Sequence, residues 1–392
     1  MPLLARIRER FRAERPLAGE RLAMSLHLEA KTAVLAELMA EGGAEVAITS
    51  SNPLSAQDDV AAALAARGVA VHARRGTDAA EFDRLHHRVL DIRPTLILDD
   101  GGELLARLVT SRRDLAPGVK GGGEETTTGV LRIRALAREG RLPFAMVVVN
   151  DAPMKHLFDN RYGTGQSTWD GIMRATNMSV AGARVVVAGY GSCGRGIAQR
   201  ARGLGAHVVV TEVDPVRANE AWMDGFAVAP MAEAVVGADI VVTATGNRGV
   251  VRAEHFAAMK DGAVLANAGH FDVEVDVAAL RRTAVETVPG RTPDVVGYRQ
   301  PDGRVLYVLA EGRLVNLAAA DGHPVEIMDL TFALQALTLE RLAREPKPPG
   351  VWPVDPDINR WVAETRLAVL GVAIDRLTPE QERYLGSWEG IG

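Results

Sequence analysis

Four polar side chains follow four apolar runs in the N-terminal half of the chain, each at the point where a predicted strand ends. An imidazole or a carboxylate can move protons, and an amide can hold a hydroxyl group. One such residue at a strand end is usually a helix cap or a turn former, but four in one sheet favour a substrate site. The four residues are His27, Asn52, Asp100 and Asn150.

Lys155 and Asp159 follow the last of these runs and are four residues apart. On a helix this spacing puts both side chains on one face, where such a pair is usually a solvated salt bridge. However, only five of the 45 basic residues are lysines, and a desolvated lysine can lose its proton near neutral pH. The pair is therefore a candidate for proton transfer, together with the adjacent Asn160 and with Glu125.

A glycine-rich turn supplies a binding site rather than a reacting group. Gly189, Gly191 and Gly194 form a Gly-x-Gly-x-x-Gly pattern between an apolar run and a predicted helix. Such glycines let the backbone approach a pyrophosphate at the helix N-terminus. Glu212 ends the next apolar run, where a carboxylate can accept hydrogen bonds from a ribose 2′-hydroxyl. Because Glu212 would repel a 2′-phosphate and outweighs the nearby Arg217, the pattern predicts NAD rather than NADP.

The elements that must hold these residues alternate between apolar strands and helices, which predicts an α/β fold of two open parallel sheets. We expect a substrate-binding domain over residues 1–162, completed by 325–350, and a Rossmann NAD-binding domain over 163–324. A small helical segment, 351–392, would follow. The expected strands are 21–26, 44–49, 95–98, 144–149, 184–188, 207–211, 239–243 and 263–267, and two short strands on either side of Asp302-Gly303.

Four further segments have distinctive patterns. The arginine-rich N-terminus predicts a solvated helix, and residues 121–129 predict flexible backbone beside carboxylates and hydroxyls. The repeated apolar residues of 325–342 predict a long helix buried on the first domain or on a partner subunit. Thr378 and the Pro-Glu-Gln that follows predict a capped helix start.

Composition limits the class of protein. The chain has 392 residues, 47% of them hydrophobic, a formal net charge of −5 and one cysteine. These values are typical of a globular protein in a reducing compartment and give no electrostatic reason to expect nucleic acid. The sequence has neither an apolar run long enough to cross a membrane nor an apolar signal segment. We therefore expect a cytoplasmic protein without a bound metal.

The motifs, taken in order from about Gly19 onward, resemble those of the S-adenosyl-L-homocysteine hydrolase family. Many co-linear motifs carry this resemblance, so chance is not a serious alternative. They are 27–33, 52–55, 99–102, 124–129, 150–151, 158–163, 187–191, 269–272, 310–317 and 322–324.

The resemblance implies the reversible hydrolysis of a nucleoside thioether, S-adenosyl-L-homocysteine, to adenosine and L-homocysteine. NAD would act as a bound catalyst that oxidises the 3′-hydroxyl and later reduces it back. The implied catalytic residues are His27 and Asp100 at the C4′ proton and the leaving thiol or incoming water, and Glu125, Lys155, Asp159 and Asn160 at the ribose hydroxyls. The resemblance also implies a homo-oligomer, a tetramer by the family's assembly.

The implied ligand contacts form two sets. Contacts to NAD are expected from Thr126, Thr127, Thr128, Asn160, Gly189, Gly191, Ser192, Cys193, Gly194, Arg195, Glu212, Arg217, Thr245, Gly246, Asn247, Ala268, Gly269, His270, Asn316 and His323. Contacts to the substrate are expected from Leu26, His27, Glu29, Lys31, Asn52, Gln57, Asp100, Glu125, Lys155, Asp159 and His323, which lies at the purine.

The chain departs from the familiar eukaryotic pattern at several positions. Thr164 stands where cysteine is usual, and the end, 388–392, lacks the Lys- and Tyr-bearing tail that reaches a neighbouring NAD site. Glu29 and Lys31 replace the threonine and glutamate expected near the purine. This combination resembles the archaeal and thermophilic branch. An ammonium suits a 6-oxo group, so S-inosyl-L-homocysteine is an alternative substrate.

Two alternatives of other classes remain. A 2-hydroxyacid dehydrogenase has a similar two-domain plan but would release NADH in proportion to product. A non-catalytic NAD-binding protein that kept the fold would have lost part of the polar set, yet His27, Asp100, Glu125, Lys155, Asp159 and His323 are all present.

Overall fold

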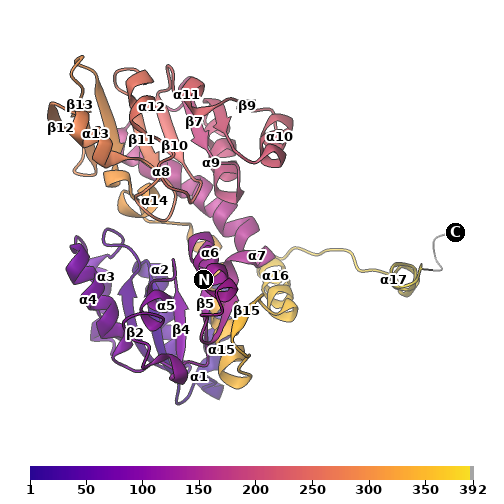
Figure 1. Cartoon of the computed structure of the whole chain (residues 1–392). Helices are drawn as coiled ribbons and strands as arrows, with labels where there is room; N and C mark the ends of the chain where they lie inside the picture. Colours follow the sequence, from indigo (N-terminus) through magenta and orange to yellow (C-terminus); the bar gives the residue numbers. More distant parts are fainter. Residues whose placement is uncertain (389–392) are drawn as a thin grey trace.

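Two lobes, each built on one sheet, make up the computed structural model, which describes residues 1–388 (Figure 1). The sheet of the first lobe has seven strands in the order β15-β6-β5-β4-β1-β2-β3, and all of its pairings are parallel. Its strands are β1 (Arg21–Leu26), β2 (Glu45–Ser50), β3 (Ala70–Val71), β4 (Leu96–Asp99), β5 (Gly121–Glu124), β6 (Ala145–Val148) and β15 (Gly350–Trp352).

Helices cover both faces of this sheet, and a cluster of buried apolar side chains lies on each face. One cluster includes side chains of α1 (Pro2–Glu14), α2 (Ala30–Glu41), α3 (Asp58–Ala66), α15 (Val325–Arg344) and α16 (Pro356–Leu370). The other includes side chains of α4 (Ala79–Leu90), α5 (Glu103–Leu108) and α6 (Thr127–Arg138). The sheet is therefore buried on both sides, as parallel sheets usually are. Short helical turns are η1 (Ala116–Gly118), η2 (Val149–Asp151) and α7 (Pro153–Lys155).

The second lobe, the upper one in Figure 1, has eight strands in the order β12-β13-β14-β11-β10-β7-β8-β9. The strands are β7 (Arg184–Ala188), β8 (His207–Thr211), β9 (Ala227–Val228), β10 (Ile240–Thr243), β11 (Val264–Asn267), β12 (Glu286–Pro289), β13 (Val295–Arg299) and β14 (Val305–Leu309). Its helices are α8 (Thr164–Thr176), α9 (Ser192–Gly203), α10 (Pro215–Met223), α11 (Met231–Ala234), α12 (Ala253–Ala258), α13 (Val277–Thr283) and α14 (Val315–Ala318), with the turn η4 (Ala310–Gly312).

One edge of this second sheet corrects the prediction of an all-parallel sheet. β13 pairs antiparallel with β14, and β12 pairs antiparallel with β13, so the sheet is mixed. The Asp302-Gly303 turn separates two strands as predicted, but so short a connection can only return the chain antiparallel. The α/β class and the parallel core of both sheets are confirmed.

Residues 121–124 form a central buried strand, β5, so the prediction of flexible backbone there is wrong. A Cβ added at Gly122 would overlap the side chain of Ile97 and would crowd Met146. These glycines therefore serve close packing between neighbouring strands. The helix after the strand begins at Thr127, with the Thr126 hydroxyl accepting a hydrogen bond from the Gly129 N–H at 3.1 Å.

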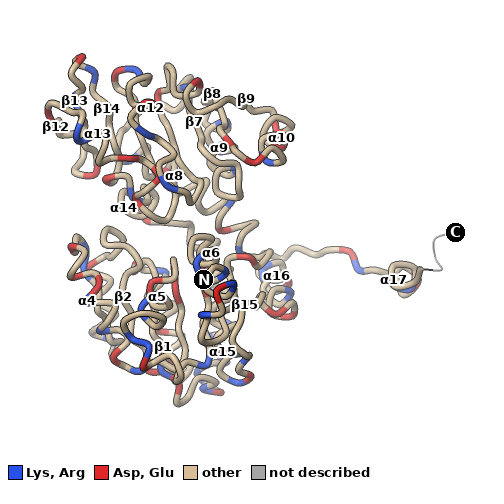
Figure 2. The backbone as a smooth tube through the Cα atoms, viewed as in Figure 1, with Lys and Arg blue, Asp and Glu red and all other residues tan. Residues whose placement is uncertain are grey.

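The N-terminal helix α1 is amphipathic, so the prediction of a solvated helix is wrong for one of its faces. Leu3, Leu4, Ile7 and Phe11 are buried in the core of the first lobe. Their spacing is helical, but the interleaved arginines obscured it. On the exposed side, Arg8 and Arg12 form ion pairs with carboxylates of α2. Acidic and basic residues are likewise interspersed over both lobes in Figure 2.

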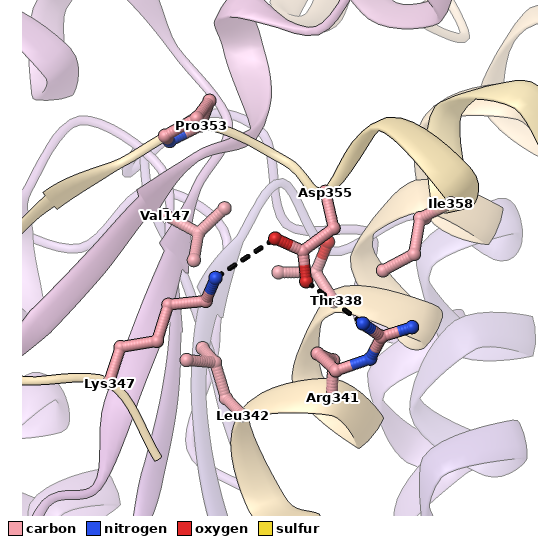
Figure 3. Close-up of a pocket in the computed structure, with 8 residues that line it drawn as sticks. All are labelled: Val147, Thr338, Arg341, Leu342, Lys347, Pro353, Asp355 and Ile358. Carbon is pink, nitrogen blue, oxygen red and sulfur yellow. Dashed lines mark hydrogen bonds and ion pairs between the residues drawn. The ribbon is translucent and has the colours of Figure 1, made fainter. Parts of the chain in front are cut away.

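The C-terminal segment adds to the first lobe a strand that the sequence pattern did not predict. β15 pairs with β6, and α16 packs on α15. The Asp355 carboxylate ties this segment down, because it accepts from Lys347 Nζ at 2.9 Å and pairs with Arg341 at 3.3 Å (Figure 3).

Beyond α16 the chain extends to α17 (Pro379–Gly386), which stands away from both lobes (Figure 1). Its predicted capping box is confirmed by paired hydrogen bonds between Thr378 and Gln381. Residues 389–392, on which the prediction about the end of the chain depends, lie outside the described residues. No helix within 1–388 is both long and apolar enough to cross a membrane.

Asp329 on α15 caps α1 from a distance in sequence, and we expect its loss to destabilise the first lobe. Its fully buried carboxylate accepts hydrogen bonds from the Leu3 and Leu4 N–H groups, both at 3.0 Å. Asp329→Ala leaves these donors unpaired and should lower the free energy of unfolding by about 1–3 kcal/mol. Calorimetry measures this, with the exposed Glu326→Ala on the same helix as the control. An unchanged midpoint would contradict the capping role.

Candidate active site

A cavity of about 1210 Å³ lies between the lobes. Its walls are the segments that follow the carboxyl ends of strands in both sheets, where open α/β sheets bind their ligands. His27 follows β1, Asp100 follows β4, and Glu125 follows β5. Residues near the ends of β7, β8, β10 and β11 line the opposite wall. The cavity is thus large enough for two ligands, one against each sheet.

His27 and Asp100 form one polar centre. The His27 Nε2 atom lies 3.1 Å from Asp100 Oδ2, which also accepts from the Ser51 hydroxyl at 2.7 Å. On the other side of the ring, Nδ1 lies 2.7 Å from the Ser55 hydroxyl. Burial lowers the pKa of His27 to about 4 despite the nearby Asp100 carboxylate, so the imidazole is neutral. A neutral imidazole can accept a proton.

Asp100 has one oxygen free for a ligand. Among the described atoms its buried Oδ1 has no hydrogen-bond partner, and neither has the buried Nε2 of His270. His270 Nδ1 is 3.7 Å from that oxygen. The ligand-type atoms of His27, Asp100 and His270 lie within 4.8 Å of one another, which is close enough to hold a metal ion. The same triangle fits a proton transfer at a bound substrate without one.

Two fully buried carboxylates fix the loop that carries Asp100. Asp99 accepts hydrogen bonds from four backbone N–H groups, those of residues 100, 103, 104 and 105. Burial raises the pKa of Asp99 to about 7, although these donors oppose the shift. Glu124 accepts from the N–H groups of Gly101, Gly102 and Thr126 at 2.9–3.1 Å. The glycine at 129 makes room, because a Cβ there would overlap the Glu124 carboxylate.

Lys155 and Asp159 form a buried ion pair, in place of the solvated salt bridge that this spacing usually makes. Lys155 Nζ is 3.0 Å from Asp159 Oδ1 and donates to Asn160 Oδ1 at 2.7 Å and to Asn150 Oδ1 at 3.3 Å. Burial by itself would lower the pKa of Lys155, but the charges of Asp159 and Glu125 more than offset it, and the pKa is raised. In the protein without ligands Lys155 is therefore an ammonium, and its role in proton transfer stays a prediction.

The Lys155 ammonium in turn holds the pKa of Asp159 below its usual range, although burial opposes this. His323 Nδ1 lies 3.4 Å from the same carboxylate. Glu125 behaves differently: burial and the charge of Asp100 raise its pKa to about 8, and Lys155 only partly compensates. The cavity thus contains an ionised aspartate and a glutamate that titrates near neutral pH, two groups suited to different steps of proton transfer.

Helix α15 supplies two site residues that the sequence analysis missed. Thr331 donates to Asp159 Oδ2 at 2.8 Å, and Gln335 Nε2 donates to Glu125 Oε2 at 2.8 Å. Their signal in the sequence was a pair of polar residues, four apart, between the apolar residues of this helix. Ser51 and Ser55, which contact His27, were also missed and stand in a Ser-rich loop after β2.

The second lobe carries the nucleotide-binding turn. Gly189 has a φ of 95°, and a Cβ at Gly194 would overlap the Gly189 carbonyl, so the strand and α9 meet closely. Residues 189, 191, 192 and 193 line the cavity at the N-terminus of α9. Glu212 accepts from the Tyr190 and Val213 N–H groups, both at 2.7 Å. The turn, the helix N-terminus and this carboxylate fit an NAD pyrophosphate and ribose.

Most of the predicted site residues line this one cavity. From the first lobe and the linker they are His27, Asp100, Glu125, Thr126, Thr127, Thr128, Lys155, Asp159 and Asn160. From the second lobe and the loop after it they are Gly189, Gly191, Ser192, Cys193, Glu212, Arg217, Thr245, Gly246, Asn247, Ala268, Gly269, His270, Asn316 and His323.

Seven predicted site residues do not line it: Leu26, Glu29, Lys31, Asn52, Gln57, Gly194 and Arg195. Several of these have a structural partner instead. Asn52 accepts from the Leu54 N–H, and Arg195 pairs with Asp224 at 3.0 Å. Lys31 Nζ lies 2.7 Å from Glu29 and donates to the Asp321 carbonyl at 2.8 Å.

Comparisons with known proteins agree with this geometry. The chain matches the S-adenosyl-L-homocysteine hydrolase family over residues 1–116 and that family's NAD binding domain over 160–322. Across 99% of its length it is 57% identical to the S-inosyl-L-homocysteine hydrolase of Methanopyrus kandleri, of which it covers 92%. The chain belongs to the S-adenosyl-L-homocysteine hydrolase family.

Other relatives have the family's own name. The chain is 54% identical to the adenosylhomocysteinase of Thermococcus kodakarensis and 56% identical to that of Thermotoga maritima. Each match spans 99% of this chain and covers 93% and 96% of those proteins, respectively. Family membership confirms the resemblance, and NAD is the cofactor of the second lobe.

Glu212 should determine both the affinity for NAD and the discrimination against NADP. Glu212→Ser removes a charged hydrogen-bond acceptor, a loss of roughly 1.5–3 kcal/mol, and leaves Arg217 without a competing carboxylate at that position. We expect NAD to bind ~10- to 100-fold more weakly and the preference over NADP to shrink. Calorimetric titration of cofactor-stripped protein measures both, with Glu220→Gln on α10 as the control. Unchanged NAD affinity would exclude Glu212 from the ribose site.

Proposed function

We propose that the protein catalyses the reversible hydrolysis of S-adenosyl-L-homocysteine to adenosine and L-homocysteine, with NAD as a bound catalyst. The observation that carries the proposal is the buried Lys155–Asp159 pair beside Glu125, in the cavity that also contains the dinucleotide turn. A thioether at C5′ is a poor leaving group, so the reaction needs the ribose to be activated first. A ketone at C3′ makes the C4′ hydrogen acidic and allows the thiol to leave by elimination.

NAD, when bound, supplies a hydride acceptor at C3′ and later the hydride donor. The protein's own groups handle the protons. Lys155, held as an ammonium by Asp159 and Asn160, is placed to donate a hydrogen bond to the 3′-oxygen, and the ionised form of Glu125 can accept the proton that the 3′-hydroxyl loses. Glu125 accepts hydrogen bonds from the neighbouring hydroxyl. Asn316, whose buried Oδ1 has no partner in the described part of the chain, offers an acceptor on the cofactor side.

We assign the removal of the C4′ proton to the Asp100–His27 centre. Asp100 Oδ1 is an unpartnered acceptor within 1–388, and His27 is neutral and 3.1 Å from the other oxygen. The same pair can protonate the leaving thiol and then activate the water that adds to C5′. In sum, one water and one thioether give one alcohol and one thiol, and the redox state of NAD is unchanged at the end of each turnover.

The decisive experiment is the reverse reaction. The purified holoenzyme is mixed with adenosine and L-homocysteine, and the condensed thioether is followed by chromatography while absorbance at 340 nm reports NADH. We expect thioether to form with no more NADH than enzyme sites, because the cofactor is reoxidised in every turnover. NADH that accumulates in proportion to product would instead support a 2-hydroxyacid dehydrogenase, and binding of NAD without any product would support a non-catalytic protein.

We also propose that the protein is cytoplasmic and forms a homotetramer. The exposed apolar side chains of the segment after α16, among them Val372, Ile374, Leu377 and Leu385, support an oligomer. Light scattering at micromolar concentration tests the assembly, and a monodisperse monomer would contradict it.

A second candidate substrate is S-inosyl-L-homocysteine, which differs in the 6-oxo group of its base. Two relatives with this specificity in their names, from Methanopyrus kandleri and Methanosarcina acetivorans, are 57% and 53% identical to this chain. Lys31 replaces an expected glutamate, and an ammonium suits an oxo acceptor. Against this reading, Lys31 is engaged by Glu29 and by the Asp321 carbonyl and does not line the cavity. The adenosyl compound therefore remains the first candidate substrate.

Lys31→Glu tests which group selects the base. If Lys31 recognises a 6-oxo group, the substitution lowers kcat/KM for the inosyl thioether and raises it for the adenosyl thioether, because it exchanges a donor for an acceptor. Lys31→Met, which removes the charge without reversing it, is the matched control. Steady-state kinetics with both thioethers measure the ratio. A ratio that is equal in wild type and both variants would show that Lys31 does not select the base.

A further inference from the structure

Helix α15 crosses under the cavity with a row of three buried polar side chains in an apolar sequence. Thr331, Gln335 and Thr338 have exposed fractions of 0%, 0% and 3%. Their spacing of four and then three residues puts them on one face of the helix. Polar groups so deeply buried usually have hydrogen-bond partners.

The first two members of the row contact ionisable residues of the site, and the third does not. Thr331 Oγ1 donates to Asp159 Oδ2, and Gln335 Nε2 donates to Glu125 Oε2, both at 2.8 Å. Thr338 Oγ1 has no hydrogen-bond partner among the residues that the structure describes. It lies instead beside the small pocket near Asp355, drawn in Figure 3.

We propose that Thr331 and Gln335 are positioning residues, of which Thr331 fixes the orientation of Asp159 and Gln335 favours the ionised form of Glu125. Neither residue lines the cavity, so each would act through the carboxylate that it contacts. Only the expected kinetic effects rest on the proposed function. The two contacts themselves are present in the protein without substrate.

Thr331 determines which way the Asp159 carboxylate points. Lys155 and His323 both approach Oδ1, at 3.0 and 3.4 Å, and Thr331 is the partner of Oδ2. Without that third contact the carboxylate can turn about its Cβ–Cγ bond. Lys155 would then lose the fixed partner that aligns its ammonium with a substrate hydroxyl. Small misplacements of a catalytic group cost large factors in rate.

Gln335 acts on the charge of Glu125. The titratable groups facing Glu125 are Asp100 after β4, Lys155 in α7 and Asp159 in the turn that follows it. Two of these three are acids, and the carboxyl is deeply buried, so its environment favours the protonated form. The Gln335 N–H opposes this because it donates to the carboxylate. It therefore increases the fraction of Glu125 in the ionised form, which can accept a hydrogen bond from a ribose hydroxyl.

The test compares Thr331→Val, Gln335→Met and Thr338→Val in the holoenzyme. All three remove polar atoms from one buried face of one helix while keeping the side-chain size close to the original. For Thr331→Val we expect kcat to fall about 10- to 100-fold with KM changed less than about threefold. Thr338→Val should stay within about twofold of wild type, because its hydroxyl has no described partner to lose.

The pH profile gives Gln335 a signature that a merely structural role would not produce. The pKa of Glu125 is raised to about 8, and removing a donor from its carboxylate makes the proton harder to lose. In Gln335→Met the acid limb of kcat/KM that reports Glu125 should therefore move to higher pH. Profiles of Gln335→Met and Thr331→Val that superimpose on wild type would overturn the proposal, even if their thermal midpoints fell.

Crystal structures of the three variants separate this inference from the proposed function. We expect Asp159 to change its side-chain torsion in Thr331→Val, and Glu125 to change in Gln335→Met, with both unchanged in Thr338→Val. Carboxylates that keep their positions in the first two variants overturn the proposal. If wild type converts neither thioether, the proposed function fails, and these torsions still decide the positioning role.

Discussion

The buried ion pair of Lys155 and Asp159 is the interaction on which the site depends. Both side chains are only 4% exposed, and removing two charges from water is costly unless further hydrogen bonds satisfy them. Here the ammonium reaches two amide oxygens besides the carboxylate, and the carboxylate is contacted by Thr331 and His323. Asn150 follows β6 of the first-lobe sheet, and Asn160 lies in the linker between the lobes. His323 precedes α15, and Thr331 lies within it. The pair therefore has this full set of partners only when α15 is packed against the linker.

The shape of the linker explains how one lysine reaches several oxygens. Residues His156–Gly163, η3, form a π-helical segment, which is wider than an α-helix and is often found at functional sites. In such a turn the positions four and five residues onward share a face. Lys155 accordingly contacts both Asp159 and Asn160. The same segment leads directly into α8, so the residues proposed to bind the ribose are joined to the wall of the nucleotide lobe.

The sequence was sufficient to predict the features of the fold and the site that depend on local patterns. Apolar runs that end in polar residues identified the parallel strands and the residues at their carboxyl ends, and the glycine pattern identified the nucleotide turn. Features that depend on contacts distant in sequence were missed. β5 was not recognised because its glycines are explained only by close packing against Ile97 and Met146, which lie on neighbouring strands. The buried face of α1 was not recognised because arginines are interleaved with its apolar residues. Thr331 and Gln335 were missed because their partners, Asp159 and Glu125, are far from them in the sequence.

Two pairs of consecutive acids show how the sheet places charge. Asp99 and Glu124 are opposite each other at the ends of neighbouring strands, and each is followed by a second acid. Successive residues on a strand point to opposite faces, so the two members of each pair have different surroundings. Asp99 and Glu124 bond to the backbone N–H groups of the loops.

Asp100 and Glu125, by contrast, face the cavity. Asp100 lies beside the neutral imidazole of His27, and Glu125 lies near the positive charge of Lys155. Four carboxylates are thereby gathered at one sheet edge without four unpaired charges. The two that bond to the backbone hold the loops in place, and burial together with the nearby charge of Asp100 raises the pKa of Glu125. The gathering of four acids at this edge follows from the register that pairs Asp99 with Glu124.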